Sequence, residues 1–506
     1  MLQKQTKSHN FEHNDFDVVV VGAGINGAVA ATAASAAGLR VLIIDKGDFA
    51  NFTSQQSSNL VWGGIKYLQS YEFALVAKLC QARNRLIRAY PNQIQEIGFL
   101  ASLGPNAPFG RFLGTFGTWF YWLIGAGGTE IPRSYSAKRA KSLEPALKAS
   151  QKAVQYFDAY LPDNDARFVY DFIRRAKSYG AQANNYTELT KATKTESGWE
   201  LELSSDSGSR KVTCSTVINA TGPFAKGVAE LLDSPTKARL VFSKGVHFTI
   251  NRRLTEGNRV LALWDEQNRL FYVLPMGDRS LVGTTDTRVD DPHTQATEAD
   301  VEFVLKQVNA QLGLDNPITK DEIVASRSGV RPLVIDSKQA DNQDWHQLSR
   351  KHVIELEENK RTISILGGKL TDCLNVGQEV VAELQKLGHQ VKLPRKWFGE
   401  GSQAKFPELV LLLKNAGLQG DELERVSKGL WRRHGESALQ FGAQNPKEVF
   451  EGLGISFGEI EYIAKNEDVK NREDLLRRRL PIAMARSEEE IAANQKLQQL
   501  LVDMGL

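Results

Sequence analysis

The chain has 506 residues, of which 42% are hydrophobic and 24% are charged, enough for roughly two to four domains with separate cores. Its 63 lysines and arginines nearly balance 60 aspartates and glutamates, so the net charge of +3 gives no support for a nucleic-acid-binding protein. The three cysteines, Cys80, Cys214 and Cys373, are far apart and form no CxxC pair. They indicate neither a disulfide framework nor a metal site, and a reducing compartment fits best.

The N-terminal residues 1–15, MLQKQTKSHNFEHND, are polar and include acids, and they lack the apolar core of a secretory signal. The first predicted element is a strand at Val18–Val21, a β-branched run typical of a parallel strand that is buried on both faces. It leads into a glycine-rich turn and an alanine-rich helix that ends at Gly38. A second strand, Arg40–Asp45, completes a βαβ unit of about 30 residues.

The turn between strand and helix, Gly22-Ala23-Gly24-Ile25-Asn26-Gly27, has the spacing of a dinucleotide-binding motif. Its glycines would permit the tight turn, the approach of a pyrophosphate, and close packing of helix on strand. The helix N-terminus would offer N–H groups to the phosphates, and Asp45 would accept hydrogen bonds from a ribose. This unit alone leaves NAD and FAD open, because both kinds of enzyme contain it.

Helical periodicity continues at Tyr71–Tyr90. Phe109–Gly127 is the nearest approach to the roughly 20 apolar residues of a membrane span, but Arg111 and several glycines interrupt it. Its aromatic cluster fits a peripheral bilayer contact, a buried segment or a dimer contact.

A helix is then expected near Ala166–Tyr179, with strands at Trp199–Leu203 and Lys211–Val217. Shorter alternating strands predict an antiparallel sheet in a second, substrate-side lobe: Val246–Ile250, Leu270–Leu274 and Ser280–Gly283.

Two later segments favour FAD over NAD. Val217–Pro223 is a strand that ends in Ala-Thr-Gly, and the strand Thr362–Leu366 leads into Gly367-Gly368-Lys369-Leu370-Thr371 and a helix. A helix N-terminus at that point could place positive potential beside a reduced flavin, a feature that an NAD enzyme does not need.

The predicted fold class is therefore α/β, with a Rossmann-type FAD-binding domain, an antiparallel-sheet substrate domain and an all-helical C-terminal domain. The first two domains are expected to interleave within residues 1–394. The FAD-binding parts would be about 15–100, 150–240 and 325–394, and the substrate parts about 101–149 and 241–324. The helical domain would be 395–506, since 401–506 lacks a strong strand signal.

Several motifs in this order resemble one family. They are DVVVVGAGINGA, TSQQSSNLVWGGIKYLQSYEFALV, VINATGP, SKGVHFTI, VLPMGDRSLVGTTDT, SGVRPL, GGKLT and, near the end, LLRRRLPIAM. The sequence is similar to the FAD-dependent glycerol-3-phosphate dehydrogenases, within the D-amino-acid-oxidase-like flavoproteins. The resemblance covers most of the chain.

The resemblance implies roles for individual residues. The ADP half of FAD would be held by Gly22, Gly24, Gly27 and Asp45. The rest of the cofactor would be lined by Ser54, Ser57, Ser58, Ala220, Gly222, Gly368, Lys369 and Thr371. The substrate would be faced by Lys66, Tyr67, His247, Thr285 and Arg331, and the catalytic residues would be His247, Arg331 and Lys369.

The chemistry of these residues agrees with those roles. The ordinary pKa of histidine, about 6.5, suits His247 to act as a base near neutral pH, although a hydrogen-bonded structural histidine is the alternative. Arg331 offers a planar fork to a phosphate, or else forms a salt bridge. Lys66 would add a second positive contact or remain solvated. Lys369 could stabilise charge on the flavin or on a developing alkoxide.

Four residues depart from the family's usual pattern. Trp62 stands where histidine is usual, Lys66 replaces arginine, Asn59 replaces lysine, and Asp372 replaces a threonine after GGKLT. Because lysine lacks the two-pronged geometry of arginine, Lys66 could change phosphate affinity or orientation. These departures leave FAD binding intact and put the substrate in question.

The leading functional prediction is oxidation of glycerol 3-phosphate to dihydroxyacetone phosphate, with electrons passed to a quinone, in glycerol metabolism. The resemblance also implies a cytoplasmic protein peripheral to the inner membrane, and a homodimer. One alternative is a related oxidase or dehydrogenase acting on a hydroxy acid or amine. Another is a non-catalytic flavin-binding protein. The arginines at 432–433 and 477–479 would meet lipid headgroups or, as we favour, form solvated faces or ion pairs within the protein.

Overall fold

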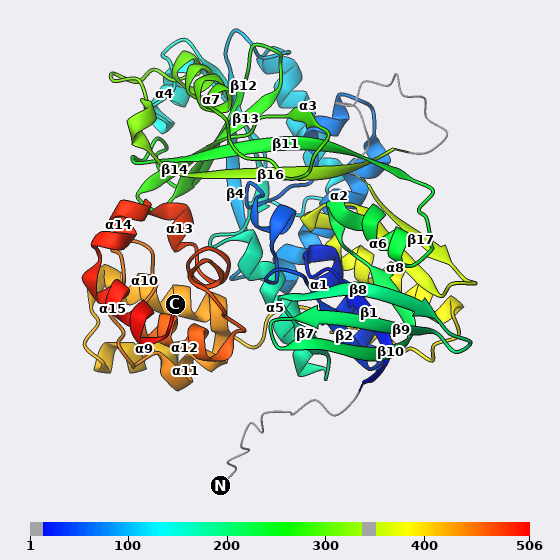
Figure 1. Ribbon diagram of the computed structural model, residues 1–506. Helices are drawn as coiled ribbons and strands as arrows, with labels where there is room; N and C mark the ends of the chain where they lie inside the picture. The colour runs from blue at the N-terminus through cyan, green and yellow to red at the C-terminus, as the bar shows by residue number, and fades with distance from the viewer. Residues whose placement is uncertain (1–13, 336–350) are drawn as a thin grey trace.

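Two β-sheets and a group of C-terminal helices make up the computed structural model, which describes residues 14–335 and 351–506 (Figure 1). The polar N-terminus discussed above lies almost wholly outside the described residues. One sheet and its helices form the lower right of Figure 1, the second sheet lies above it, and the C-terminal helices lie at the lower left.

The first sheet contains the predicted βαβ unit, formed by β1 (Asp15–Val21), α1 (Ile25–Ala36) and β2 (Val41–Ile44). The remaining strands of this sheet are β7 (Gln182–Asn184), β8 (Thr187–Lys194), β9 (Trp199–Ser205), β10 (Gly208–Asn219), β17 (His352–Glu357) and β18 (Thr362–Gly367). The strand order is β17-β18-β10-β1-β2-β7, with β9 pairing with β10 and β8 with β9. Strands β18, β10, β1, β2 and β7 are parallel.

Both faces of β1 are covered, which explains its continuous run of valines. Val18 and Val20 pack with helices α1, α5 (Asp165–Ser178) and α8 (Cys373–Lys386). Val19 and Val21 pack instead with residues of β8 and β9, which curl over the other face. A strand buried on both sides has no position for a polar residue, so hydrophobic alternation is lost.

The second sheet is mainly antiparallel, as predicted for the substrate-side lobe. Its strands are β3 (Leu60–Val61), β4 (Gln95–Leu103), β5 (Arg133–Tyr135), β6 (Lys152–Tyr160), β11 (Arg239–Ile250), β12 (Arg259–Trp264), β13 (Leu270–Met276), β14 (Arg279–Gly283), β15 (Thr287–Val289) and β16 (Ile323–Ile335). The order is β15-β11-β14-β13-β12-β4-β6-β3, with β16 on β11 and β5 on β6. Helices α2 (Phe73–Ala89), α3 (Arg111–Ile124), α4 (Ala137–Leu143) and α7 (Glu298–Gln311) accompany it.

This pairing departs from the domain boundaries predicted at residues 100, 150 and 325. Strands β4 and β6 pair with each other over nine positions and belong to the second sheet. The long strand β16 also joins this sheet, through β11. Hydrophobic runs identify strands but not their partners, so the sequence could not assign these three to a sheet.

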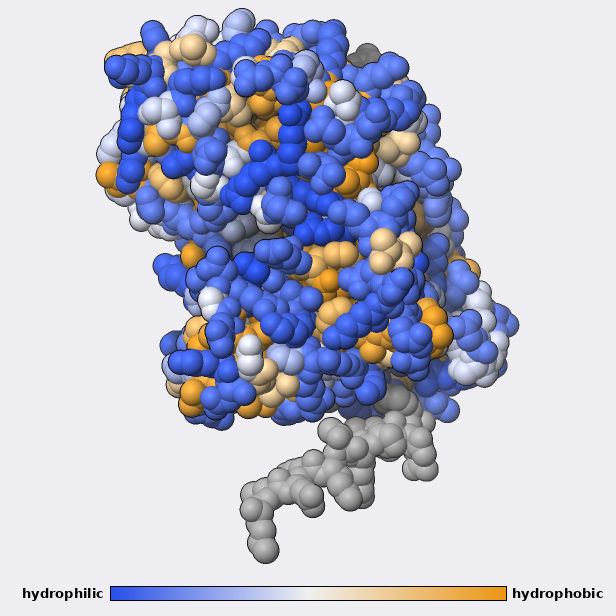
Figure 2. Space-filling view, turned by 90° about the vertical axis from the view of Figure 1, so that its left-hand side faces the viewer, coloured by the Kyte–Doolittle hydropathy of each residue, from blue (hydrophilic) through white to orange (hydrophobic). Residues whose placement is uncertain are grey.

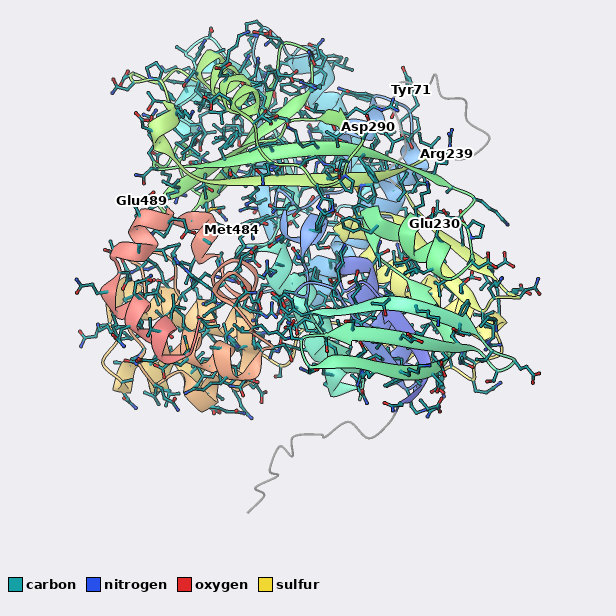
Figure 3. All side chains as sticks on the ribbon, viewed as in Figure 1. Tyr71, Glu230, Arg239, Asp290, Met484 and Glu489 are labelled. Carbon is teal, nitrogen blue, oxygen red and sulfur yellow. The ribbon has the colours of Figure 1, made fainter. Side chains whose placement is uncertain are left out.

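The C-terminal part consists of helices, as expected. They are α9 (Phe406–Asn415), α10 (Gly420–His434), α11 (Ala438–Phe441), α12 (Phe457–Asn466), α13 (Ile482–Ala485), α14 (Glu488–Ala493) and α15 (Gln495–Asp503), with a π-helical turn at Asp474–Arg479. These helices also contact the second sheet: Figure 3 places Met484 where α13 approaches it, and Thr249 donates to the Met484 carbonyl at 2.7 Å.

The face of the molecule in Figure 2 is largely hydrophilic, with small, separate hydrophobic areas. The segment Phe109–Gly127 forms α3 together with the turns at its ends. Across residues 14–335 and 351–506, no helix has the length and apolar character needed to cross a membrane.

Candidate active site

The glycine-rich turn after β1 is tightly built around its three predicted glycines. Gly22 has a φ of 96°, in the left-handed region that favours glycine. A Cβ atom at Gly27 would lie 1.8 Å from the Gly22 carbonyl oxygen, and one at Gly24 would lie 2.9 Å from the Ser54 hydroxyl. The turn therefore has the close helix–strand packing that a dinucleotide cradle requires.

Asp45, at the end of β2, holds the same turn in place. Its carboxylate accepts hydrogen bonds from the backbone N–H groups of Ala23, at 2.7 Å, and Gly47, at 2.9 Å. Each carboxylate oxygen can accept more than one hydrogen bond, so Asp45 remains able to accept from a ribose hydroxyl.

A second glycine turn meets the first. Gly367 and Gly368, after β18, have φ values of 64° and 102°. The Asn26 side-chain amide, at the start of α1, donates to the Gly367 carbonyl oxygen at 3.0 Å. Two segments separated by 341 residues thus form one wall.

A cavity of 760 Å³ lies over these turns. Its lining includes most of the residues predicted for the ADP half of the cofactor and its surroundings: Gly22, Gly24, Asp45, Ser54, Ala220, Gly222 and Gly368. Gly27 lies just behind this lining and shapes it through the close approach to Gly22.

A second cavity, of 290 Å³, continues from the first. The two share Ile25, Thr53, Ser54, Pro332 and Gly368. The second is lined by the other predicted flavin and substrate residues: Ser57, Ser58, Lys66, Thr285, Arg331, Lys369 and Thr371. Of the residues predicted to face the substrate, only Tyr67 and His247 lie behind the lining in the part of the chain that the structure describes.

Arg331 is held with its guanidinium group on the second cavity. It donates to Thr284 at 2.9 Å and to Ser243 at 3.3 Å, and it lies 3.6 Å from the carboxylate of Asp286. Gly245 makes room for it, because a Cβ atom there would lie 2.1 Å from a guanidinium nitrogen. The salt bridge foreseen as an alternative is present, and Arg331 still lines the cavity.

His247 reaches the cavity only through Ser58. Its Nε2 atom lies 2.7 Å from the Ser58 hydroxyl oxygen, and the histidine is 1% exposed. Burial, together with the positive charges of Arg327 and Arg331, holds the pKa of His247 well below its ordinary value. The imidazole is therefore neutral at physiological pH and ill suited to accept a proton.

Tyr67 also acts indirectly. Its ring is buried, and the Lys369 ammonium group lies 4.2 Å from the ring centre and 5.6 Å from the centre of the Trp62 ring. Aromatic faces attract cations, so the two rings help to fix Lys369 at the cavity wall. The Thr371 hydroxyl accepts from the backbone N–H of Trp62 at 3.1 Å and donates to the Trp62 backbone carbonyl at 3.2 Å, which holds this segment beside the second glycine turn.

Asn59 and Asp372, two of the four departures from the family's usual pattern, each bind a charged or titratable neighbour. The Asn59 side-chain oxygen accepts from the guanidinium group of Arg327 at 3.3 Å, so a positive charge lies next to position 59. Asp372 lies 2.9 Å from Nδ1 of His352, whose Nε2 lies 2.7 Å from Glu379. Burial alone would lower the pKa of His352, but the bonds to these two carboxylates prevail and raise it.

Several residues that line the second cavity were not predicted from the sequence, including Gln56, Arg269, Thr284 and Asp286. Arg269 stands immediately before β13, donates to Asp265 at 2.8 Å and adds a fourth cation to Lys66, Arg331 and Lys369. Its position directly before a predicted strand was the available signal. Which end of that strand would face the site depends on sheet pairing and could not be foreseen.

Comparisons with known proteins agree with this geometry. The family described as FAD dependent oxidoreductase matches residues 17–354. The chain is 30% identical over 462 residues to a mitochondrial glycerol-3-phosphate dehydrogenase of Bos taurus, covering 84% of this chain and 60% of that protein. It is 29% identical over 511 residues to the D-erythritol 1-phosphate dehydrogenase of Brucella abortus (strain 2308), covering 94% of this chain and 96% of that one.

The fold is similar to that of the glycerol-3-phosphate dehydrogenase from Bacillus halodurans complexed with FAD, with a TM-score of 0.74 and 21% identity. The match covers 97% of this chain and 91% of that one. The two closely packed glycine turns and the two joined cavities that they border fit FAD. With the family match covering most of its length, this chain belongs to the FAD-dependent oxidoreductases.

Proposed function

We propose that this protein oxidises glycerol 3-phosphate to dihydroxyacetone phosphate. The observation that carries the proposal is a small second cavity, joined to the dinucleotide cavity, in which the cationic residues Lys66, Arg269 and Arg331 accompany Lys369. A phosphate monoester carries close to two negative charges at neutral pH, and arginine forks suit its geometry. The glycerol-3-phosphate dehydrogenases among its relatives support the same substrate class.

The residues divide the work between anchoring and orientation. Arg331, fixed by Thr284 and Ser243, binds the phosphate group together with Lys66 and Arg269. FAD, when bound, would accept the two electrons together with the hydrogen that leaves the substrate carbon, and the hydroxyl proton would pass to solvent. Lys369 stabilises negative charge that develops on the substrate oxygen.

The substrate hydroxyl group is oriented by Ser58 and Thr285, whose side chains line the cavity. Because burial and the guanidinium groups of Arg327 and Arg331 lower the pKa of His247, it is a weak base, and we assign it the task of orienting the Ser58 hydroxyl. It is thus a positioning residue.

The decisive experiment is anaerobic bleaching of the flavin in the purified holoprotein, with glycerol 3-phosphate as substrate and glycerol as control. Bleaching by the phosphate ester alone supports the proposal, and an oxidised flavin that no alcohol bleaches supports a non-catalytic protein instead. D-Erythritol 1-phosphate belongs in the same experiment, because a relative of nearly equal length carries that name. Faster bleaching by D-erythritol 1-phosphate would identify it as the better substrate, and the assignment of the phosphate-binding residues would stand.

We also propose that the protein lies on a membrane surface and passes its electrons to a quinone. One stripe of α3 is apolar and exposed: Phe112 is 90% exposed, Phe116 63% and Leu123 62%, while Tyr121 on the opposite side is buried. An exposed apolar helix face is typical of an interfacial contact. The helix packs beside the 3-10 turn Ile65–Leu68, which carries Lys66 of the second cavity.

Sedimentation of the holoprotein with anionic liposomes tests this second proposal. We expect binding that is lost in Phe112→Ser/Phe116→Ser and kept in Val502→Ser, which alters an exposed apolar residue of α15. Light scattering without lipid identifies the other occupant of this face, a second copy of the chain. Peroxide formed in stoichiometric amount with product would indicate an oxidase instead of a quinone-linked enzyme.

A further inference from the structure

The segment Asp48–Asn59, here called the serine loop, lines both cavities. Asn51, Phe52, Thr53 and Ser54 face the first cavity, and Gln56, Ser57 and Ser58 face the second. Two of its side chains also reach other walls: the Ser54 hydroxyl accepts from the backbone N–H of Ile25 at 3.0 Å, and Thr53 donates to the Val330 carbonyl at 2.7 Å. The shape of this loop therefore decides the shape of the cofactor site.

The serine loop holds a backbone conformation that it would not adopt alone. Ala50, Phe52 and Asn59 have φ values of 63°, 60° and 58°, in the left-handed region. Non-glycine residues enter this region at a cost and remain there only when their surroundings fix them. Contacts from outside the loop must supply that restraint.

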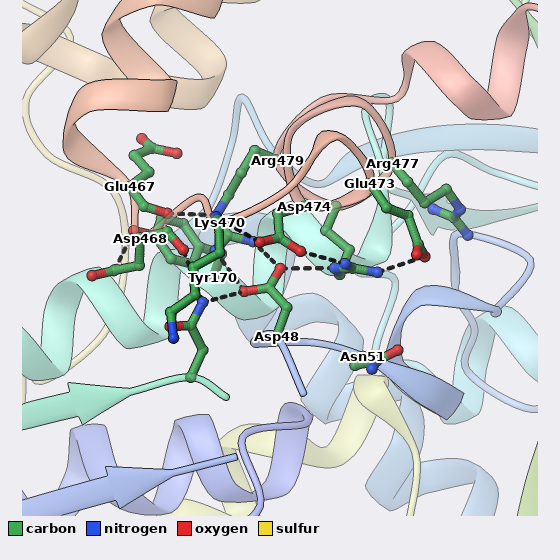
Figure 4. A network of polar contacts seen from close by, with 12 residues as sticks. Asp48, Asn51, Tyr170, Glu467, Asp468, Lys470, Glu473, Asp474, Arg477 and Arg479 are labelled. Carbon is green, nitrogen blue, oxygen red and sulfur yellow. Dashed lines mark hydrogen bonds and ion pairs between the residues drawn. The ribbon is translucent and has the colours of Figure 1, made fainter. Parts of the chain in front are cut away.

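One part of this restraint comes from three successive arginines of the C-terminal helical domain, Arg477–Arg479, in the π-helical turn (Figure 4). Arg479 forms a two-pronged pair with Asp48, at 2.7 and 2.9 Å, and Arg478 donates to the same carboxylate at 2.7 Å. Arg477 donates to the backbone carbonyl of Gln55. The three side chains thus bind the loop at Asp48 and at Gln55, seven residues apart in the sequence.

These contacts are buried and mutually supported. The side chains of Asp48 and Arg479 are 0% exposed. Behind them, Arg479 donates to the Glu467 carbonyl at 3.0 Å and lies 4.0 Å from the centre of the Tyr170 ring, while Arg478 also pairs with Asp474 at 2.5 Å. A buried ion pair with a complete set of hydrogen bonds specifies one arrangement of the groups that it joins.

Asp48 links this network to the nucleotide end of the site as well. Its carboxylate accepts from the Asn185 side chain at 2.9 Å, next to the end of β7. Burial alone would raise the pKa of Asp48, but the guanidinium groups of Arg479 and Arg478 prevail and lower it. The Asp48 carboxylate is therefore ionised. The C-terminal helical domain supplies the guanidinium groups that pair with it.

We propose that the C-terminal helical domain is part of the cofactor site, and that Arg477–Arg479 are positioning residues that hold the serine loop in the shape that receives FAD. The arginine run, left open above between lipid contacts, solvated faces and ion pairs, serves as a set of internal ion pairs and hydrogen bonds. This inference rests on FAD as the cofactor and is independent of the substrate.

The test compares two conservative substitutions in the full-length protein. Arg479→Lys keeps the charge but loses the two-pronged geometry on Asp48. The matched control is Arg279→Lys, which alters another buried arginine at a contact with the C-terminal helices, where Arg279 of β14 pairs with Glu490 of α14 and shares no partner with the Asp48 network. Both variants are expected to unfold at a lower temperature than the parent protein. Only Arg479→Lys is expected to raise the Kd of FAD, by about tenfold or more, as loss of one charged contact would.

Fluorescence titration of the apoprotein with FAD gives the Kd, and the visible spectrum of bound flavin reports the shape of its surroundings. An equal Kd of FAD in Arg479→Lys and Arg279→Lys, with unchanged spectra, would overturn the proposal. Should Arg479→Lys fail to fold, Arg477→Met decides the matter, since it removes only a desolvated guanidinium group that binds the Gln55 carbonyl. Weaker FAD binding with an unchanged melting temperature in the apo form supports the proposal, and unchanged FAD binding contradicts it.

Discussion

The Nε2 atom of His247 lies 2.7 Å from the hydroxyl oxygen of Ser58, and only the serine of this pair lines the second cavity. A histidine in such a position can act on the substrate only by way of the serine. Two neighbouring guanidinium groups and burial oppose its protonation, so orientation of the serine is the role that its surroundings permit.

We expect His247→Gln to slow anaerobic flavin reduction by about tenfold or less, because the glutamine amide can still hold the Ser58 hydroxyl, whereas loss of a general base costs about 10²- to 10⁴-fold. Stopped-flow measurement at several pH values checks this. The rate of both proteins should respond to pH in the same way. A loss of about a thousandfold, accompanied by a shifted pH profile, would restore His247 as the base.

The pair formed by His352 and Asp372 should make stability depend on pH. The pKa of His352 is raised in the folded protein, so its stabilising contribution is complete below the unfolded pKa of about 6.5 and is lost as pH rises through the folded value. We expect Asp372→Thr to lower the melting temperature more at about pH 6 than at about pH 9.

The control for that measurement is Asp206→Thr, an exposed carboxylate 3.6 Å from Lys470. That pair is exposed and contains no histidine, so the effect of its loss should be small at both pH values. An equal fall in melting temperature of Asp372→Thr at both pH values would show that Asp372 does not stabilise the charged form of His352.

Gly245→Ala should weaken substrate binding without disturbing FAD. The new methyl group would lie 2.1 Å from the guanidinium group of Arg331, which can move aside because it is the end of a flexible side chain. We expect KM for glycerol 3-phosphate to rise about tenfold with little change in kcat, since displacement of one phosphate contact costs about 1.4 kcal/mol. Steady-state kinetics measure both constants. Gly401→Ala, where a Cβ atom meets nothing within 4 Å, should leave them unchanged.

Gly27→Ala should abolish FAD binding. Its Cβ atom would lie 1.8 Å from the backbone oxygen of Gly22, and neither α1 nor β1 can retreat from a packed core. The purified variant is expected to lack the flavin absorption band, as its visible spectrum would show. Gly110→Ala, whose Cβ atom meets nothing within 4 Å, serves as control, and a yellow Gly27→Ala protein would contradict the tight turn described here.

The local parts of the site could be predicted from sequence, because strand, glycine turn and helix follow one another within the first βαβ unit. Gly22, Gly24 and Asp45 line the first cavity, where the motif predicted a nucleotide. Residues that depend on long-range packing were less predictable. Tyr67 and His247 belong to the site but lie behind its lining, because the direction of each side chain is set by the elements packed against it.

Arg269 was missed for the same reason, since the pairing of β13 with β14 and the turn before β13 bring it to the cavity. The assignment of β4 and β6 to the second sheet likewise required partners that no hydrophobic pattern names. The arginines 477–479 show the limit most clearly: solvated faces or internal ion pairs were favoured for them, but their burial and their partners could not be predicted from a run of charges.

The hydrogen bond between Asn26 and the Gly367 carbonyl also bears on biosynthesis. The first strand of the site is synthesised early, but the Gly367–Gly368 turn opposite it is translated only after most of the polypeptide. Arg477–Arg479 are translated later still. A nascent chain therefore has no complete receptacle for the flavin, and we expect the cofactor to be acquired after synthesis. Proteins translated from messenger RNAs that end before codon 479 should then fail to retain the flavin.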